Sequence, residues 1–272
     1  MLKAVSELKA TTLTQELLEH LQNEASHAPD PVTENLPEPQ ILFLGTTSMK
    51  PTQHRGASAI YVFNRRAAVL MDVAEGTYGQ LYDHFVTKER VSTVLLNTRV
   101  ILITHIHGDH CFGIYKILLE RDNALRKVDE ASRTPVYVTA PSIMMKSLEH
   151  FVSQEVCHKD LIKLIPSNHV DPEPASHYEC LHTVDPSVPY EERVFNTEET
   201  CPVIDRAEIE NRIANIVPKS AEAAEMYSVM ASELGFEKLC MAEVNHCLDA
   251  YCAVLVSQTH GNILYSGDTV PC

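Results

Sequence analysis

The stretch that decides the fold is Thr104-His105-Ile106-His107-Gly108-Asp109-His110, which directly follows a short apolar run. In an extended loop, side chains two residues apart point the same way, so His105 and His107 can reach one metal ion. Asp109 and His110 are then available to a second ion beside the first. The spacing therefore predicts a centre for two adjacent metal ions at the end of a buried strand.

The donor atoms of this stretch indicate which metal it binds. Imidazole nitrogen and carboxylate oxygen suit zinc, and mixed sets with open positions are typical of catalytic sites. Gly108 lets the backbone turn between the two ligand pairs. The competing interpretation is a histidine-rich surface loop, because 14 histidines in 272 residues make clusters more frequent by chance. The pattern H-x-H-x-D-H behind a buried strand is demanding enough to favour the metal site.

Two further ligand candidates lie far downstream in the chain. His246 stands in the segment 244–247 at the entry to a predicted strand, and Asp268 stands in 266–269 just after another. Loops at strand ends line active sites, which makes both positions suitable for ligands. Taken alone, each is equally consistent with a surface histidine or an ordinary turn aspartate.

The composition is that of a folded chain. A length of 272 residues, with 44% hydrophobic and 22% charged, predicts a soluble globular protein of one large domain or one and a half. No apolar run approaches the roughly 18 residues needed to span a bilayer, and the N-terminal residues lack the apolar region of a cleavable signal. The eight cysteines form no C-x-x-C pair, which favours reduced thiols in an intracellular compartment. Cys111 and Cys247, which each follow a candidate ligand, are interpreted as packing residues.

The net charge of −15 argues, by itself, against a nucleic-acid partner. The acid is unevenly spread, however, since eleven acidic residues lie between Asp171 and Glu210, opposed only by Arg193 and Arg206. In the remainder of the chain, the numbers of acidic and basic residues are much closer to equal. A bound pair of zinc ions would also add positive charge at the place where a phosphate must sit.

Hydrophobic periodicity predicts strands that alternate with helices, and therefore an α/β layered fold. The predicted strands are 41–44, 59–63, 67–71, 100–104, 136–139, 251–256 and 262–265, and the predicted helices are 12–24, 77–88, 114–125, 142–156 and 204–236. Four prolines between 29 and 39 indicate a linker. We therefore expect an N-terminal helix and Pro-rich linker over 1–40 and a single folded domain over 41–272. Within that domain, residues 166–203 are predicted to form an acidic surface insertion.

Several stretches, taken together and in order, carry a family resemblance: 43–48, 70–81, 104–110 with the helix 113–125 behind it, 244–247 and 265–272. They resemble the tRNase Z family, the transfer-RNA 3′ processing endonucleases of the metallo-β-lactamase fold. The ending Tyr-Ser-Gly-Asp-Thr-Val-Pro-Cys is especially similar to the catalytic half of the long eukaryotic form. The similarity runs over about 40–165 and 234–272, and as a set these motifs are highly specific.

The resemblance implies a fold and an activity. The fold is the metallo-β-lactamase αββα sandwich, and the activity is that of a zinc-dependent endoribonuclease. Its partner is precursor tRNA, from which it removes the 3′ trailer and leaves a 3′-hydroxyl. The resemblance also implies a nuclear or mitochondrial location, with the cytoplasm left open, and no membrane association. A homodimer, or intramolecular pairing with a second half-domain, is a further implication.

The resemblance also assigns roles to individual residues. It implies that His105, His107 and His246 hold one zinc ion, that Asp109 and His110 hold the other, and that Asp268 bridges both. The remaining candidates are Asp109 as the catalytic group that orients water or accepts its proton, Asp72 and Glu75 as supports of ligand histidines, and Arg55 as a phosphate contact. Loop capping is an equal alternative for Asp72 and Glu75, and a solvated loop residue for Arg55.

Two departures from the family pattern qualify these implications. The family loop Pro-x-Lys-x-Arg-Asn appears as residues 51–56, in which only Pro51 and Arg55 match, so discrimination of the tRNA end is left open. The chain also ends at Cys272, before the family's His-Glu-Ala-Thr segment and its last ligand histidine, which implies a truncated chain with an incomplete second half. The rival hypotheses are another binuclear phosphodiesterase of the same fold, and an inactive truncated metal-binding fragment.

Overall fold

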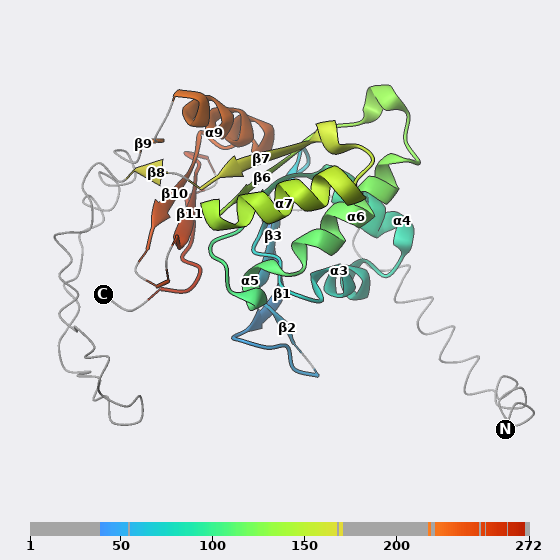
Figure 1. Ribbon diagram of the computed structural model, residues 1–272, viewed down its shortest axis with the longest axis horizontal. Helices are drawn as coiled ribbons and strands as arrows, with labels where there is room; N and C mark the ends of the chain where they lie inside the picture. The colour runs from blue at the N-terminus through green and yellow to red at the C-terminus, as the bar shows by residue number, and fades with distance from the viewer. Residues whose placement is uncertain are drawn as a thin grey trace, which may run out of the picture.

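The computed structural model describes most of the domain predicted for 41–272 (Figure 1). The described residues are 39–53, 55–167, 169–170, 217–218, 221–244, 246–247, 249–259 and 261–269. The helix predicted at 12–24, the proline-rich linker, nearly all of the acidic insertion and the first part of the helix predicted for 204–236 lie outside these residues.

The centre of the fold is a seven-stranded sheet with the strand order β2-β1-β3-β4-β5-β6-β7. Its strands are β1 Gln40–Thr47, β2 Gly56–Ala57, β3 Ala59–Phe63, β4 Ala68–Met71, β5 Thr98–Leu102, β6 Val136–Ala140 and β7 Ile162–Pro166. β1 and β4 each pair with β3 in an antiparallel manner, whereas the strands from β4 to β7 run parallel. Because parallel strands end at the same edge, the segments that follow β4 and β5 lie side by side.

Helices cover one face of this sheet (Figure 1). They are α3 Thr77–Phe85, α4 Lys88–Asn97, α6 Ile114–Leu125 and α7 Ser142–Glu155, and the short 3₁₀ turns η1 Glu130–Ser132 and η2 Lys159–Leu161 lie between the later elements. In α6, the buried residues Ile114, Ile117 and Leu118 follow the helical period and enter the core on this face. Among the described residues, no helix has the length and apolar character that crossing a membrane requires.

The opposite face packs against a second, smaller sheet and one helix. This sheet consists of β10 Lys238–Glu243, β11 Tyr251–Val256 and β12 Ile263–Tyr265, all antiparallel, and the helix is α9 Ala221–Leu234. Leu239 and Met241 of β10 point into the core shared with the large sheet, whereas Cys240 lies on the outer side. None of the described helices contributes to that outer apolar cluster. A two-residue ladder joins β8 His169–Val170 to β9 Val217–Pro218.

Within the described residues, most of the predicted strands and helices are confirmed, and the structure differs from the prediction at the following places. The helix predicted for 77–88 is α3, which ends at Phe85 because the chain reverses at Val86, which has a φ of 66°. Thr87 then caps α4 by accepting a hydrogen bond from the backbone N–H of Arg90 at 3.2 Å. The strand predicted for 100–104 is β5, which ends at Leu102 and leaves Thr104 in the loop. The helix predicted for 204–236 is wrong at 217–218, where the chain forms strand β9. The strands and α-helices that were not predicted are β2, β7, β8, β9, β10, α4 and the short helix α5 Gly108–Cys111.

Candidate metal centre

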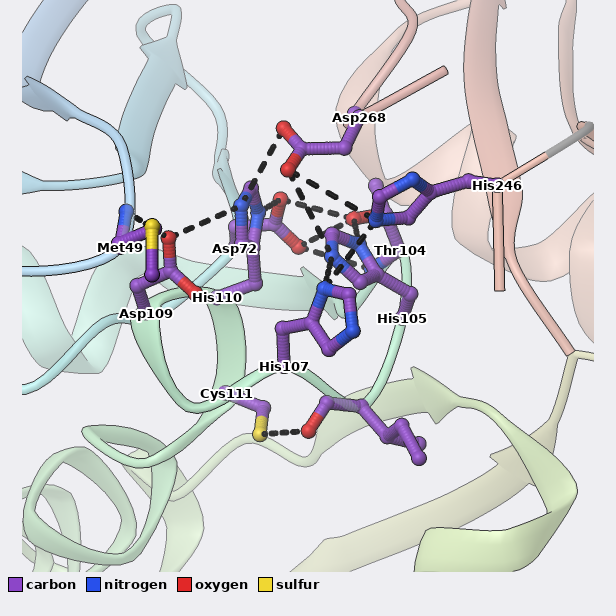
Figure 2. Close-up of polar contacts among 12 residues, drawn as sticks. Met49, Asp72, Thr104, His105, His107, Asp109, His110, Cys111, His246 and Asp268 are labelled. Carbon is purple, nitrogen blue, oxygen red and sulfur yellow. Dashed lines mark hydrogen bonds and ion pairs between the residues drawn. The ribbon is translucent and has the colours of Figure 1, made fainter. Parts of the chain in front are cut away.

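Four of the six predicted ligands converge on one point (Figure 2). His105 and His107 lie in the loop after β5, His246 lies in the loop before β11, and Asp268 follows β12. Each of these residues offers one ligand atom, and all four atoms lie within 4.8 Å of one another. Residues more than 130 positions apart in the sequence are therefore brought to the same site by the packing of the two sheets.

The ring of His105 is held in one orientation by its neighbour Thr104. The Thr104 hydroxyl lies 2.9 Å and 3.0 Å from the two oxygens of Asp72, to which it donates its proton, and 2.9 Å from Nδ1 of His105. Because the hydroxyl has only one proton, its oxygen accepts the Nδ1–H of the imidazole. This assignment follows from the hydrogen-bond network and leaves the lone pair of Nε2 directed into the site.

Three imidazole nitrogens approach each other closely at the centre. Nε2 of His105 lies 3.0 Å from Nδ1 of His107, and Nε2 of His246 lies 3.1 Å from that same Nδ1. Two nitrogens bound to one tetrahedral zinc ion stand roughly 3.3 Å apart, given metal–nitrogen distances of about 2.0–2.1 Å. In the tautomers that present unprotonated nitrogens to the centre, all three could bind one cation. The spacing and the donor types of this set therefore fit a zinc ion.

Asp268 faces both halves of the site through its two oxygens. Oδ2 lies 4.0 Å from Nε2 of His105 and 3.8 Å from Nε2 of His246, whereas Oδ1 lies 3.4 Å from Nε2 of His110. The same Nε2 of His110 also lies 3.7 Å from Oδ2 of Asp109. The carboxylate of Asp268 thus stands between a three-histidine set and an aspartate–histidine pair.

Asp72 is the hydrogen-bond hub beneath the site. It is fully buried, follows β4 and has a φ of 56°, a left-handed conformation that is uncommon outside glycine. Its carboxylate accepts the Nδ1–H of His110 at 2.6 Å, the backbone N–H of Thr104 at 2.8 Å and the hydroxyl of Tyr265 at 2.6 Å. Asp72 therefore holds His110 so that its Nε2 faces the two site carboxylates.

The surroundings shift the pKa values of the two buried histidines, His105 and His110, in opposite directions. Burial, reinforced by the neighbouring His110, lowers the pKa of His105 to about 4. His105 is therefore neutral at pH 7, which is the form that binds a metal. Burial also opposes the charged form of His110, but the hydrogen bond to Asp72 and the charges of Asp72, Asp268 and Asp109 together raise its pKa. The second half of the site thus favours a positive charge.

Two contacts at the site had no signal in the sequence. The backbone N–H of Met49 donates to Oδ2 of Asp109 at 2.6 Å, so the loop after β1 reaches the centre through its backbone. Tyr265 lies in a stretch that was matched to the family, but only its hydroxyl contact with Asp72 reveals a role. Backbone donors carry no residue-type signature, and a strand tyrosine is ordinarily a packing residue.

The two remaining candidate residues, Arg55 and Glu75, are not part of the four-residue cluster. Arg55 and Glu75 are both exposed, Arg55 in the loop before β2 and Glu75 in the turn before α3. The roles suggested for their side chains stay predictions. His54, the neighbour of Arg55, lies outside the described residues. Cys111 is buried in the helix-side core, as expected of a packing residue, and donates to the carbonyl oxygen of Ile106 at 3.4 Å.

The loop that carries His246 is fastened on both sides. The backbone N–H of Val244 donates to the carbonyl oxygen of Ala250 at 2.9 Å, and the N–H of Tyr251 donates to the carbonyl oxygen of Thr104 at 2.9 Å. The second of these bonds joins the smaller sheet directly to the histidine loop. His246 is therefore positioned by backbone pairing as well as by core packing.

Comparison with known proteins gives this geometry a context. Residues 55–140 match the model of the metallo-beta-lactamase superfamily. The chain is 29% identical over 263 residues to zinc phosphodiesterase ELAC protein 2 of Rattus norvegicus and 28% identical over 261 residues to the Homo sapiens protein. Each alignment covers 95% of this chain but 26% of the relative, so the chain spans about a quarter of the length of these relatives.

A plant relative and a solved structure agree with this result. The mitochondrial tRNase Z TRZ4 of Arabidopsis thaliana is 35% identical over 114 residues, which cover 42% of this chain and 11% of that protein. The crystal structure of a long-form RNase Z from yeast superposes with a TM-score of 0.57 and 22% identity, over 85% of this chain and 30% of the yeast chain. The predicted α/β sandwich is thereby confirmed. The chain has the metallo-β-lactamase fold, and its domain is related to that of tRNase Z.

Proposed function

We propose that this chain supplies the catalytic metal centre of a zinc-dependent endoribonuclease that removes the 3′ trailer of precursor tRNA and leaves a 3′-hydroxyl. The observation that carries the proposal is the convergence of His105, His107, His246 and Asp268 within 4.8 Å of one another. The names of the relatives supply the substrate class, since they are zinc phosphodiesterases and tRNase Z proteins. The activity itself belongs to proteins about four times longer than this chain.

In this proposal each donor has a stated place. His105, His107 and His246 would hold one zinc ion, Asp109 and His110 would contribute to the second, and Asp268 would contribute to both. A pair of zinc ions, when bound, supplies Lewis-acid activation of water and of the phosphate oxygens. The position of Asp268, with one oxygen toward each histidine group, supports the shared role.

The protein's own side chains perform the remaining work. Asp109 accepts the proton of the attacking water at its carboxylate, where Oδ2 is already fixed by the N–H of Met49. Asp72 and Thr104 accept the Nδ1–H groups of His110 and His105, so that both Nε2 atoms face the centre. Glu75 and Arg55 stay candidates for further support and for phosphate contact.

Partner and location follow as part of the same proposal. Precursor tRNA is the nucleic-acid partner, despite the net charge of −15. A second half-domain, in the same protein or in a homodimer, provides additional contact surface. The location is intracellular, in the nucleus or the mitochondrion, and the mitochondrial name of the plant relative supports the second of these.

Metal removal is expected to destabilise the chain. Zinc that binds the folded chain and not the unfolded one should, at 100 times its dissociation constant, add about 2.7 kcal/mol to the free energy of unfolding. Thermal unfolding of zinc-loaded and chelator-treated protein, with zinc counted by atomic spectroscopy, measures this difference. Equal midpoints together with less than one zinc ion per chain would contradict the metal centre.

The substrate is tested separately on the zinc-loaded chain. A precursor tRNA with a 3′ trailer is expected to be cut once, with a 3′-hydroxyl on the tRNA product, and the cut should disappear with chelator and return with zinc. Hydrolysis of bis(p-nitrophenyl) phosphate without any cut in the tRNA would favour another binuclear phosphodiesterase. Zinc binding without hydrolysis of either compound would favour a non-catalytic metal-binding module.

A further inference from the structure

The segment from Tyr265 to Asp268 contacts the loops that follow β4 and β5 at two points. The hydroxyl of Tyr265 donates to Oδ2 of Asp72 at 2.6 Å. Two residues further on, Gly267 has a φ of 58° and lies so close to Thr104 that an added Cβ would stand 2.8 Å from the threonine hydroxyl oxygen. The segment therefore contacts the first half of the fold just before it delivers Asp268.

The two residues that receive this segment are the same two that orient ligand histidines. Asp72 holds Nδ1 of His110 at 2.6 Å, and Thr104 holds Nδ1 of His105 at 2.9 Å (Figure 2). Each of them thus contacts one histidine ring and one point of the Asp268 segment. The relative position of the carboxylate and the two rings is set through shared neighbours that are not themselves ligands.

We propose that Tyr265 is a positioning residue, whose hydroxyl places the Asp268 carboxylate between the two histidine groups by anchoring its segment to Asp72. This inference deepens the proposed zinc centre and rests on it. The contact joins β12 of the smaller sheet to the end of β4 in the larger one, 193 positions earlier in the chain.

The role of the hydroxyl is separable from that of the ring. The ring of Tyr265 packs against the core between the sheets, and its strand is paired to β11, where Tyr265 lies opposite Ala253. The substitution Tyr265→Phe keeps the ring and the strand pairing and removes the hydroxyl, which donates to Asp72 and also contacts the side chain of Ser58. His110 and Thr104 continue to donate to Asp72 in this variant, so the hub itself persists.

The experiment compares zinc affinity in the wild-type chain, in Tyr265→Phe and in the control Tyr61→Phe. Tyr61 is buried in the helix-side core, where its hydroxyl donates to the carbonyl oxygen of Val94 at 3.2 Å, away from the site. Zinc dissociation constants are measured by competition with a chromophoric chelator. Cobalt spectra report the ligand geometry, and thermal midpoints report the fold.

Tyr265→Phe is expected to weaken zinc binding about 10-fold, as is typical when a partner outside the ligand set is removed, and to change the visible cobalt spectrum. Tyr61→Phe is expected to change the zinc dissociation constant less than about 2-fold. Similar thermal midpoints for the two variants would show that the difference in zinc affinity does not come from a general loss of stability. If the two variants bind zinc equally well with the wild-type cobalt spectrum, Tyr265 is only a packing residue and the inference fails. Absence of zinc binding by the wild-type chain would instead overturn the metal centre, and this inference with it.

Discussion

Replacing Asp268 by asparagine is expected to reduce phosphodiester hydrolysis by about three orders of magnitude. In the proposed centre, a metal pair would contribute several kcal/mol to charge stabilisation in the transition state, and each 1.36 kcal/mol corresponds to a factor of ten in rate. Asparagine keeps the size of the side chain but removes the negative charge and one acceptor oxygen. Asp268 is the one described side chain whose oxygens face both His105 and His110, so its loss affects both halves of the site.

The matched control for this variant is Asp83→Asn. Asp83 is exposed on α3, and the substitution makes the same change of charge away from the site. Hydrolysis rates and zinc content are measured for both variants under the same conditions. If Asp268→Asn kept two zinc ions and a rate within about tenfold of the wild-type protein, Asp268 would not be shared between the ions.

Replacing Gly113 by alanine is expected to destabilise the fold by about 3 kcal/mol, at the upper end of what overpacking usually costs. A Cβ at this position would stand 2.0 Å from the carbonyl oxygen of Ala74 and 2.8 Å from its carbonyl carbon. Neither group can yield easily, because Val73 and Ala74 are fully buried. Val73 also accepts the N–H of Gly113 at 2.8 Å and donates its own N–H to the carbonyl oxygen of His110 at 2.7 Å.

The control for this prediction is Gly79→Ala in α3, where nothing lies within 4 Å of the added Cβ. Alanine has the higher helix propensity, so this variant should gain up to about 1 kcal/mol. Urea unfolding of both variants gives the free energies directly. A loss below about 1 kcal/mol for Gly113→Ala would show that the segment after β4 can move away from α6.

The elements that the sequence predicted well are those with a strong local period. Helix α6 was predicted with its observed ends, because apolar residues recur at the helical spacing from Ile114 to Leu125. The break between α3 and α4 was missed, since Val86 adopts a positive φ that its residue type does not announce. β7 and β10 were missed because charged residues interrupt their apolar runs, so that their pairing to β6 and β11, rather than their own pattern, identifies them as strands.

The residues of the candidate site also fall into those that the local sequence pattern reveals and those that only the tertiary structure reveals. Ligand-type residues within one short stretch, such as His105 and His107, are recognised from spacing alone because the loop geometry is local. His246 and Asp268 were individually ambiguous and became members of one cluster only when the smaller sheet packed on the larger. Supports such as Tyr265 and the N–H of Met49 are visible only as distances between distant segments.

The sequence by itself determined the chemistry available to this protein, since it supplies imidazoles and carboxylates at the ends of apolar strands together with the motifs of a known fold. The tertiary structure alone decided which nitrogen of each histidine faces the centre. It also decided that Asp268 stands between two histidine groups, and that Asp72 and Thr104 hold both the rings and the segment that carries Asp268. The physical reason is that side-chain type is a local property, whereas tautomer, orientation and convergence are set by hydrogen bonds between segments far apart in the chain.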